Sequence, residues 1–266
     1  MDLGLKGRVA IVTGGSEGIG KAAALSMAKE GARVAIMARR KDVLEKAADD
    51  LRHRSGGSGG EVIAVPCDVR VEANIKDAIK SVADRWGRVD ILVNNAGTSS
   101  AAKFENVTDD MLSEDLKLKV YGAVYCSRAV LPYMKKARWG RIINITTPGG
   151  KAAPGGTLPT SLSRAAGIAI TKAMSKDYAA DNILVNTVCI GLIKSGQHER
   201  RYDRLKQSEP GLTLDAFYGN LGKGVPLGRV GESQEAGDLI CFLASERASY
   251  ISGTAVNVDG GAAPVV

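Results

Sequence analysis

The chain has 266 residues, 44% of them hydrophobic and 24% charged, a balance that suits one large α/β domain with a sizeable core. It has two histidines, His53 and His198, in unrelated surroundings, so we expect no histidine-rich centre and no bound metal. The net charge is +7, but the positive residues are spread along the chain. That spread argues against nucleic acid as a partner and favours a mild attraction to anionic small molecules.

Short β-branched apolar runs alternate with longer helical patterns along the chain. The first run is bounded by Gly7 and Gly14 and is too short for a helix, which is typical of a buried parallel strand. Gly31 predicts the end of the first helix, and Pro132 predicts the interruption or the end of the long fourth helix. The predicted strands cover residues 9–12, 34–37, 61–66, 90–93, 141–145, 183–189 and 254–258. The predicted helices cover residues 18–30, 41–54, 72–86, 109–136, 160–180 and 232–245.

The alternation of strands and helices with short connections predicts a parallel sheet covered by helices on both faces. Residues 55–60 are a Ser/Gly run that we interpret as a flexible connection within a domain, because it is too short to separate two domains. We therefore expect residues 1–266 to form a single doubly wound, Rossmann-type α/β domain with a seven-stranded parallel sheet. An eight-stranded barrel is the alternative, but the chain has one predicted strand too few for it.

The four cysteines stand apart from one another, each in or beside an apolar stretch, and form no CxxC pair. The N-terminal residues lack the apolar segment of a signal peptide, and no run reaches about 18 apolar residues. We therefore expect a cytoplasmic protein with buried, reduced thiols and no contact with a membrane.

A glycine-rich segment, Thr13–Gly20, follows the first predicted strand and opens the first predicted helix. Glycines at this place allow a tight turn and let backbone N–H groups and the helix N-terminus approach a pyrophosphate. The spacing is GxxxGxG, and its position between strand and helix predicts a dinucleotide site. The residues expected to contact the cofactor here are Gly14, Ser16, Glu17, Gly18, Ile19 and Gly20.

With this segment the sequence resembles the short-chain dehydrogenase/reductase family nearly from end to end. The further motifs are Cys67-Asp68-Val69, Asn94-Asn95-Ala96-Gly97 and the closing Ser252-Gly253 with Val258-Asp259-Gly260-Gly261. The resemblance implies that Asp68 and Val69 hold the adenine of the cofactor, and that Asn95, Ala96 and Gly97 line its ribose. After the sixth strand, Gly191 and Ile193 match the residues that meet the nicotinamide carboxamide, although the family's proline is absent there.

The end of the second strand bears on the choice between NADP and NAD. NAD enzymes usually place an acid there for the ribose hydroxyl, whereas this chain has Arg39 and Arg40, which suit the 2′-phosphate of NADP. We therefore expect NADP, with NAD as the less favoured cofactor. Glu17 stands against this expectation, because some NADP-dependent relatives carry a basic residue in the glycine loop.

The resemblance breaks at the catalytic positions, where relatives use an asparagine, a serine, a tyrosine and a lysine. Aligned by the neighbouring serine and alanines, this chain has Lys119, Thr147, Thr160 and Arg164 at those four positions. Thr147 keeps a hydroxyl that can orient a substrate oxygen, and Arg164 can still hold the cofactor ribose. Thr160 is the serious change, because an aliphatic hydroxyl is a far poorer acid than a phenol with its pKa of about 10.

Lys119 is the best alternative general acid, because a desolvated lysine can titrate near neutral pH. It could equally be a pocket cation that compensates for the lost lysine. Residues 194–224 are polar and irregular, with short helical pieces, and in relatives this stretch covers the substrate. Within it we expect His198 and Tyr218 to contact a small-molecule substrate.

Three functions remain open from the sequence. The first is an NADP(H)-dependent oxidoreductase acting on a carbonyl or alcohol through a non-standard active site. The second is a lyase, hydrolase or isomerase on the same fold without redox turnover, and the third is a catalytically silent nucleotide-binding protein. The resemblance also implies a homodimer or homotetramer.

Overall fold

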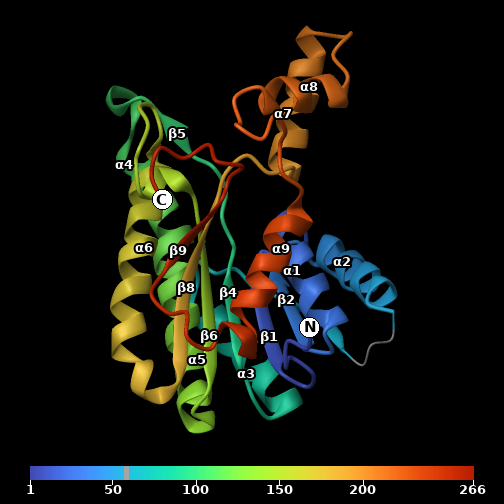
Figure 1. Ribbon diagram of the computed structural model, residues 1–266, viewed down its shortest axis with the longest axis vertical. Coiled ribbons are helices and arrows are strands. Elements are labelled where there is room, and N and C mark those ends of the chain that lie inside the picture. Colours follow the sequence, from blue (N-terminus) through green and yellow to red (C-terminus); the bar gives the residue numbers. More distant parts are fainter. Residues whose placement is uncertain (57–59) are drawn as a thin grey trace.

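A computed structural model describes residues 1–56 and 60–266, and its centre is one parallel sheet of seven strands (Figure 1). The strand order is β3-β2-β1-β4-β6-β8-β9, which confirms the predicted doubly wound α/β fold. Residues 57–59 of the expected flexible connection lie outside the described residues. The strands are β1 (Val9–Thr13), β2 (Arg33–Ala38), β3 (Val62–Pro66), β4 (Ile91–Asn94), β6 (Gly140–Thr146), β8 (Ile183–Ile190) and β9 (Ala255–Val258).

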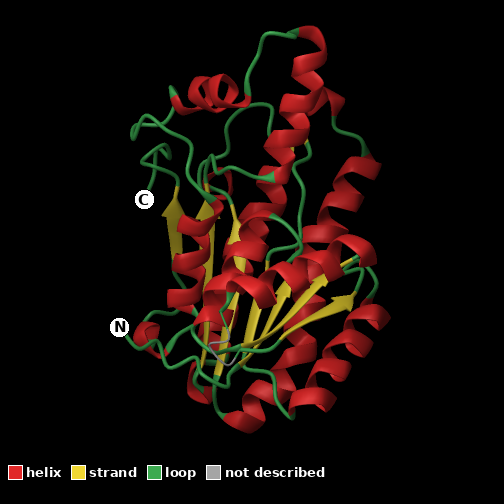
Figure 2. Cartoon of the chain, turned by 90° about the vertical axis from the view of Figure 1, so that its right-hand side faces the viewer, coloured by secondary structure: helices red, strands yellow, loops and turns green. Residues whose placement is uncertain are grey.

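Helices cover both faces of this sheet (Figure 2). One face packs against α1 (Gly18–Lys29), α2 (Lys41–Arg54) and α9 (Ser233–Leu243). The other face packs against α3 (Glu72–Trp86), α5 (Gly122–Ala137) and α6 (Thr160–Asp177). Two apolar cores result, one on each side of the sheet, as expected for buried parallel strands.

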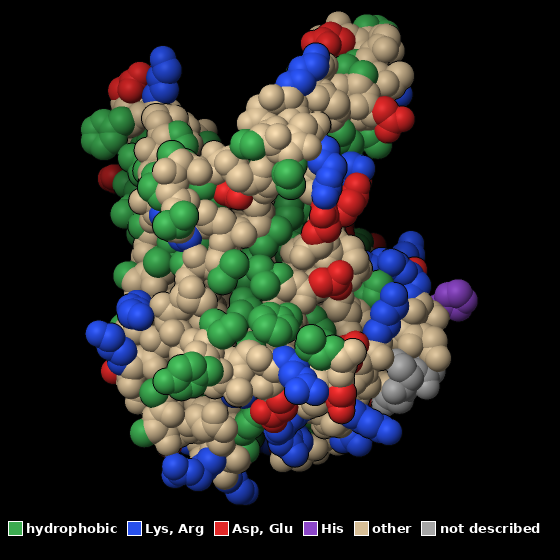
Figure 3. All heavy atoms as spheres, in the orientation of Figure 1, with side chains coloured by type: hydrophobic (Ala, Val, Ile, Leu, Met, Phe, Trp, Pro, Cys, Tyr) green, Lys and Arg blue, Asp and Glu red, His purple; other side chains and the backbone are tan. Residues whose placement is uncertain are grey.

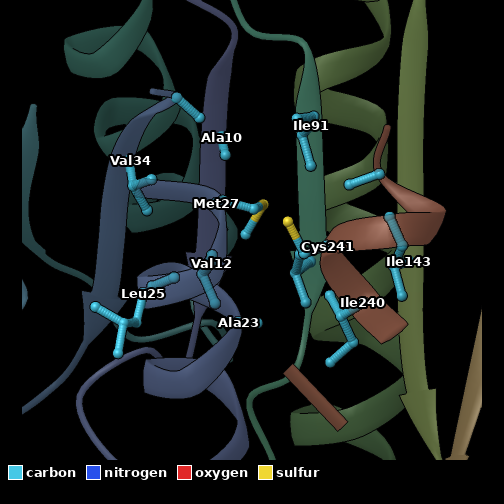
Figure 4. Close-up of a cluster of buried hydrophobic side chains, with 14 of the residues drawn as sticks. Ala10, Val12, Ala23, Leu25, Met27, Val34, Ile91, Ile143, Ile240 and Cys241 are labelled. Carbon is cyan, nitrogen blue, oxygen red and sulfur yellow. The ribbon is translucent and has the colours of Figure 1, made fainter. Parts of the chain in front are cut away.

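The first strand shows how the sequence builds these two cores. Ala10 and Val12 point into the core beneath α1 and α9, whereas Val9 and Ile11 point into the opposite one, because side chains alternate along a strand. Figure 4 shows Ala10 and Val12 facing the helices of the first core. There α9 packs closely on α1, since a Cβ on Gly237 would come within 2.7 Å of the Ala22 backbone.

The central helical region is divided into two helices, and not at the proline. Helix α4 (Asp109–Leu116) passes through a wider, π-helical segment at Lys117–Tyr121 into α5. The prediction that Pro132 would interrupt or end the helix is wrong, because Pro132 lies inside α5. The carbonyl that it leaves without a helical donor belongs to Arg128, which is exposed, so that water can satisfy it.

The stretch expected to be irregular contains two well-formed helices, α7 (Gly196–Ser208) and α8 (Leu214–Gly222), which project from the rest of the molecule at the top of Figure 1. They share a small apolar cluster of their own around Phe217, Tyr218 and Val230. We call residues 194–224 the lid segment. Its helices were underestimated from the sequence because α7 buries none of its residues, so it shows no apolar face.

A two-stranded antiparallel sheet also escaped prediction. It pairs β5 (Ala101–Ala102) with β7 (Leu158–Pro159), so the loop after β4 lies beside the start of α6. Strands of two residues carry no periodicity, so only the tertiary structure shows them.

Candidate functional site

A cavity of about 500 Å³ opens at the carboxyl ends of β1, β4 and β6, where the strand order reverses. Figure 3 shows the surface hollowed between the body of the protein and the projecting α7 and α8. The volume lies within the range of small-molecule and cofactor sites. The cavity brings together most of the residues predicted from the sequence, namely Gly14, Ser16, Glu17, Gly18, Ile19, Arg39, Arg40, Asp68, Val69, Asn95, Ala96, Gly97, Thr147, Thr160, Arg164, Gly191, Ile193 and His198.

The glycine loop makes the floor of one end of this cavity. Gly14 and Gly18 have φ values of +64° and +55°, a backbone conformation that favours glycine. A Cβ on Gly20 would collide with the Asn95 side chain, so Gly20 serves close packing and does not itself line the cavity. The first-turn amides of α1 have no carbonyl within their own helix to bind, so they are suited to an anion.

Asn95 holds the glycine loop in place. Its side-chain amide donates to the carbonyl oxygens of Thr13 at 2.9 Å and of Gly14 at 3.1 Å. The Thr13 hydroxyl in turn accepts from the backbone N–H groups of Asn95 and Ala96 at 3.0 and 3.1 Å. The ends of β1 and β4 are therefore tied together at the edge of the cavity.

Two arginines approach the Glu17 carboxylate at the mouth of the cavity, and a third lines the cavity. Glu17 accepts from Arg40 at 2.6 Å and lies 3.6 Å from a guanidinium nitrogen of Arg200 on α7. Arg39 lines the same cavity. This end of the cavity therefore has a positive excess that suits a phosphate group.

Asp68 lies between the glycine loop and the sheet edge, and Arg70 fixes its carboxylate. The closest of their contacts joins Arg70 Nη2 to Asp68 Oδ2 at 2.7 Å. Hydrogen bonding by Arg70 lowers the pKa of Asp68 below its usual value. The carboxylate is therefore charged and oriented at neutral pH.

Thr160, the first residue of α6, binds the loop after β4. Its hydroxyl donates to the Ser100 carbonyl at 2.6 Å and accepts from the Ser100 N–H at 2.9 Å. It also accepts from Lys119 Nζ at 2.9 Å. The Thr160 hydroxyl thus lies on a residue that lines the cavity, with its donor already engaged.

Lys119 reaches Thr160 from the π-helical segment and is paired with Asp115 on α4. The two side chains are 1% and 2% exposed. Burial, followed by the charge of Arg164, lowers the pKa of Lys119 to about 8, while Asp115 opposes the shift. Lys119 does not line the large cavity but lines a smaller one of about 20 Å³ behind it, which also borders Arg164.

Arg164 lies one turn after Thr160 on α6 and lines both the large cavity and the small one. Its Nη1 donates to the Ile145 carbonyl at 2.7 Å, and burial lowers its pKa to about 10. Its buried Nε has no hydrogen-bond partner in the described part of the chain. Because a guanidinium carries several N–H donors and Arg164 lines the cavity, this side chain fits the hydroxyl groups of a cofactor ribose.

Of the three predicted substrate contacts, two line the cavity and one does not. Thr147 and His198 line the cavity, and burial lowers the pKa of His198, so its ring is neutral at pH 7. Tyr218 does not line the cavity, because its ring packs in the small apolar cluster of α7 and α8. The centroid of its ring lies 5.3 Å from that of Phe217 and 6.4 Å from that of His198. The structure therefore gives no support to Tyr218 as a substrate contact.

Three residues of the site were missed from the sequence. Asp115 is four residues before Lys119, a helical spacing that could have indicated the pair. Gln197 accepts from the Ser99 N–H at 3.1 Å and Arg200 approaches Glu17, so the first turn of α7 contacts both walls of the cavity. No local pattern could have indicated these two contacts, because each joins residues nearly a hundred or more positions apart.

Among residues 1–56 and 60–266, no group of histidine, cysteine and acidic side chains could hold a metal ion. Within the same residues, no helix combines the length and hydropathy needed to span a membrane. All four cysteines are buried free thiols.

A family model described as enoyl-(acyl carrier protein) reductase matches residues 14–263 of the chain. Oxidoreductase UcpA of Salmonella typhimurium is 34% identical over 258 residues, which cover 97% of this chain and 95% of that protein. The chain belongs to the short-chain dehydrogenase/reductase family.

Solved structures of other short-chain dehydrogenases/reductases are similar over the whole chain. L-sorbose reductase from Gluconobacter frateurii, complexed with NADPH and L-sorbose, is 31% identical with a TM-score of 0.94 and covers 100% of both chains. An NADPH-bound short chain oxidoreductase from Pseudomonas aeruginosa PAO1, which contains an atypical catalytic center, is also 31% identical. Its TM-score is 0.89, over 97% of this chain and 98% of that one. These relatives confirm the predicted fold and family, and they support the predicted NADP cofactor.

Proposed function

We propose that this protein is an NADP(H)-dependent oxidoreductase that interconverts a carbonyl and an alcohol on a small-molecule substrate. The observation that carries the proposal is that one continuous cavity joins Arg39 and Arg40 at one end to Thr147, Thr160 and Arg164 at the other. A dinucleotide with a 2′-phosphate needs such an arrangement of positive charge, glycine loop and hydroxyl-lined end. The NADPH complexes of two similar structures support it.

The chain offers a residue for each part of the cofactor. Arg39 and Arg40 would bind the 2′-phosphate, and the first turn of α1 the pyrophosphate. The nicotinamide ring would supply or accept hydride. Asp68 and Val69 would hold the adenine, Asn95, Ala96 and Gly97 would line the ribose beside it, and Gly191 and Ile193 would meet the carboxamide. Arg164, which lines the cavity, would bind the nicotinamide ribose through its guanidinium.

The proton for the substrate oxygen would come from Lys119 by way of Thr160. In reduction, the oxygen would compete with the Ser100 carbonyl for the hydrogen of the Thr160 hydroxyl. As that hydrogen leaves, Thr160 takes one from Lys119 Nζ, which becomes a neutral amine. The contact of 2.9 Å and the pKa of about 8 both favour this transfer. Thr147 would orient the substrate oxygen.

The first experiment is a fluorescence titration with NADPH and NADH, followed by NADPH oxidation with a panel of small ketones and aldehydes. We expect NADPH to bind more tightly and at least one carbonyl to be reduced. Lys119→Ala should lower turnover about 100-fold or more, as general-acid catalysis contributes typically that much. Failure to bind either cofactor would overturn the proposal, and full turnover in Lys119→Ala would remove Lys119 as the proton source.

A catalytically silent nucleotide-binding protein is the second candidate, and the hydrogen bonds of Thr160 favour it. Its donor is engaged by Ser100, and Lys119 is buried away from the large cavity. This candidate predicts NADPH binding without turnover in the wild type, and turnover only after Thr160→Tyr with Arg164→Lys restores the family's pair. Turnover in the wild type would exclude it.

We also propose a homo-oligomer, supported by the surface of α6. The residues that α6 buries are Ser161, Ser163, Thr171 and Ser175, whereas Leu162 is 46% exposed and Ala165 and Ala169 are also exposed. A helix that turns its apolar residues outward is suited to covering by another copy. Light scattering should give a dimer or tetramer, and Leu162→Glu should dissociate it. The buried free thiols fit the reducing cytoplasm, which we keep as the proposed location.

A further inference from the structure

We propose that Asp115 is a positioning residue that holds Lys119 beside Thr160 and keeps it in the charged form from which a proton can be given. The inference rests on the proposed function, because it assigns the control of the same proton. Neither the sequence resemblance nor the family's four catalytic positions includes this residue.

The geometry fixes Lys119 from two sides. Asp115 Oδ1 accepts one hydrogen of Lys119 Nζ, and the Thr160 hydroxyl accepts another at 2.9 Å. Asp115 is near the end of α4, and Lys119 is four residues later, inside the π-helical segment. The wider turn keeps both side chains on the same face of the helix, toward α6. Without Asp115, the flexible lysine side chain would have one hydrogen bond left to hold it.

The charges around Lys119 show why it needs this carboxylate. Two charged groups face its amine, Asp115 from α4 and Arg164 from α6. Burial and Arg164 both favour the neutral amine, and Asp115 alone opposes them. The negative charge of the Asp115 carboxylate therefore determines how far Lys119 is protonated near neutral pH.

The Asp115 carboxylate also lacks the full set of hydrogen bonds expected of a purely structural ion pair. Its Oδ2 is buried and has no hydrogen-bond partner in the described part of the chain. A buried acceptor left unpaired lowers the stability of the folded protein. Asp90 provides a contrast, since it is fully buried but both of its oxygens are bonded, to Arg88 and to the Val9 N–H. An unpaired buried polar atom requires an explanation, and a role in the reaction is one of those known.

The test is a direct titration of Lys119 in the full-length protein without substrate. Lysines labelled with ¹³C at Cε are followed by NMR from pH 6 to 11, and Lys119→Met identifies the signal. We expect Lys119 to titrate near pH 8 in the wild type and about one unit or more lower in Asp115→Asn, the size expected for loss of an adjacent opposite charge. Asp115→Glu should restore a value close to that of the wild type.

Asp90→Asn is the matched control, because it neutralises a buried carboxylate outside the site. It should destabilise the protein without moving the titration of Lys119. If Asp115→Asn does not fold, Asp115→Ser takes its place, since it leaves room for water at the lost carboxylate. An unchanged titration of Lys119 in a folded Asp115 variant would overturn the inference.

A second readout uses turnover. In the direction of reduction the active Lys119 is protonated, so kcat/KM should fall as the pH rises through its pKa. In Asp115→Asn that fall should move to lower pH by the same amount as the NMR titration, while the dissociation constant of NADPH stays within about twofold. A profile that does not move would overturn the inference. A shifted NMR titration in a protein without turnover would instead overturn only the proposed function.

Discussion

Glu17 and Arg40 form an ion pair of 2.6 Å at the mouth of the cavity, at the place where Arg40 is expected to meet the 2′-phosphate of the cofactor. The carboxylate and the phosphate would thus compete for the same guanidinium. This relationship explains how an acidic residue in the glycine loop is compatible with NADP. We expect the pair to lower the affinity for NADPH without abolishing the binding site.

Glu17→Gln should therefore tighten NADPH. An ion pair between partly exposed groups contributes about 0.2–1 kcal/mol, so the dissociation constant of NADPH should fall by a factor of about 1.4 to 5, while that of NADH stays unchanged. Fluorescence titration of both cofactors measures this. A weaker NADPH affinity in Glu17→Gln would mean that Glu17 itself supports the cofactor.

The double variant Arg39→Ala with Arg40→Ala should weaken NADPH by more than tenfold and NADH by much less. Hydrogen bonds to a charged phosphate contribute about 1.5–3 kcal/mol, and NADH has no phosphate at that position. Arg54→Ala, an exposed arginine at the end of α2, is the control and should change neither affinity. Equal losses for both cofactors would contradict the assignment of the two arginines.

Thr160→Val should lower stability and turnover together, because it keeps the shape of the side chain but removes its hydroxyl. Three hydrogen bonds to Ser100 and Lys119 are lost, which we expect to reduce the free energy of unfolding by about 1–3 kcal/mol. Urea denaturation measures the loss, and Thr160→Ser should recover most of it. If valine were tolerated without change in either property, the contact with Lys119 would have no role.

The depressed pKa of Lys119 predicts how stability depends on pH. Between its folded value of about 8 and the ordinary lysine value near 10.4, the unfolded chain binds more protons than the folded one, so the free energy of unfolding rises with pH there. Below pH 8 the buried charge costs about 3 kcal/mol in full, if nothing else changes. Relative to Lys119→Met, the wild type should gain stability between pH 8 and 10, as urea denaturation at both pH values would show. A constant difference would contradict the low pKa.

The sequence predicted those parts of the site that depend on neighbouring residues. The strand, glycines and helix of Thr13–Gly20 follow from local periodicity and backbone freedom, and Arg39 with Arg40 follows from the end of the next strand. The prediction that Thr160 stands at the position of the family's tyrosine rests on the neighbouring serine and alanines in the same way. These features needed no knowledge of distant contacts.

The remaining parts depend on tertiary structure. The hydrogen bonds between Thr160 and Ser100 accompany the pairing of β5 with β7. That pairing could not be predicted, because strands of two residues have no pattern in the sequence. The spacing of Asp115 and Lys119 is visible in the sequence, but their burial, which lowers the pKa of Lys119, could not be predicted from it. The helix prediction at Pro132 was wrong because the proline is tolerated inside α5, where Arg128, four residues earlier, is exposed. The exposure of Arg128 cannot be read from the proline itself.

The position of α7 has a consequence for the exchange of ligands. It touches both walls of the cavity through its first turn, at Gln197 and Arg200, yet it buries none of its residues. Breaking these contacts would leave the two cores of the sheet intact. We therefore expect substitutions at Gln197 and Arg200 to change the rate at which ligands leave the cavity with little effect on the melting temperature of the protein.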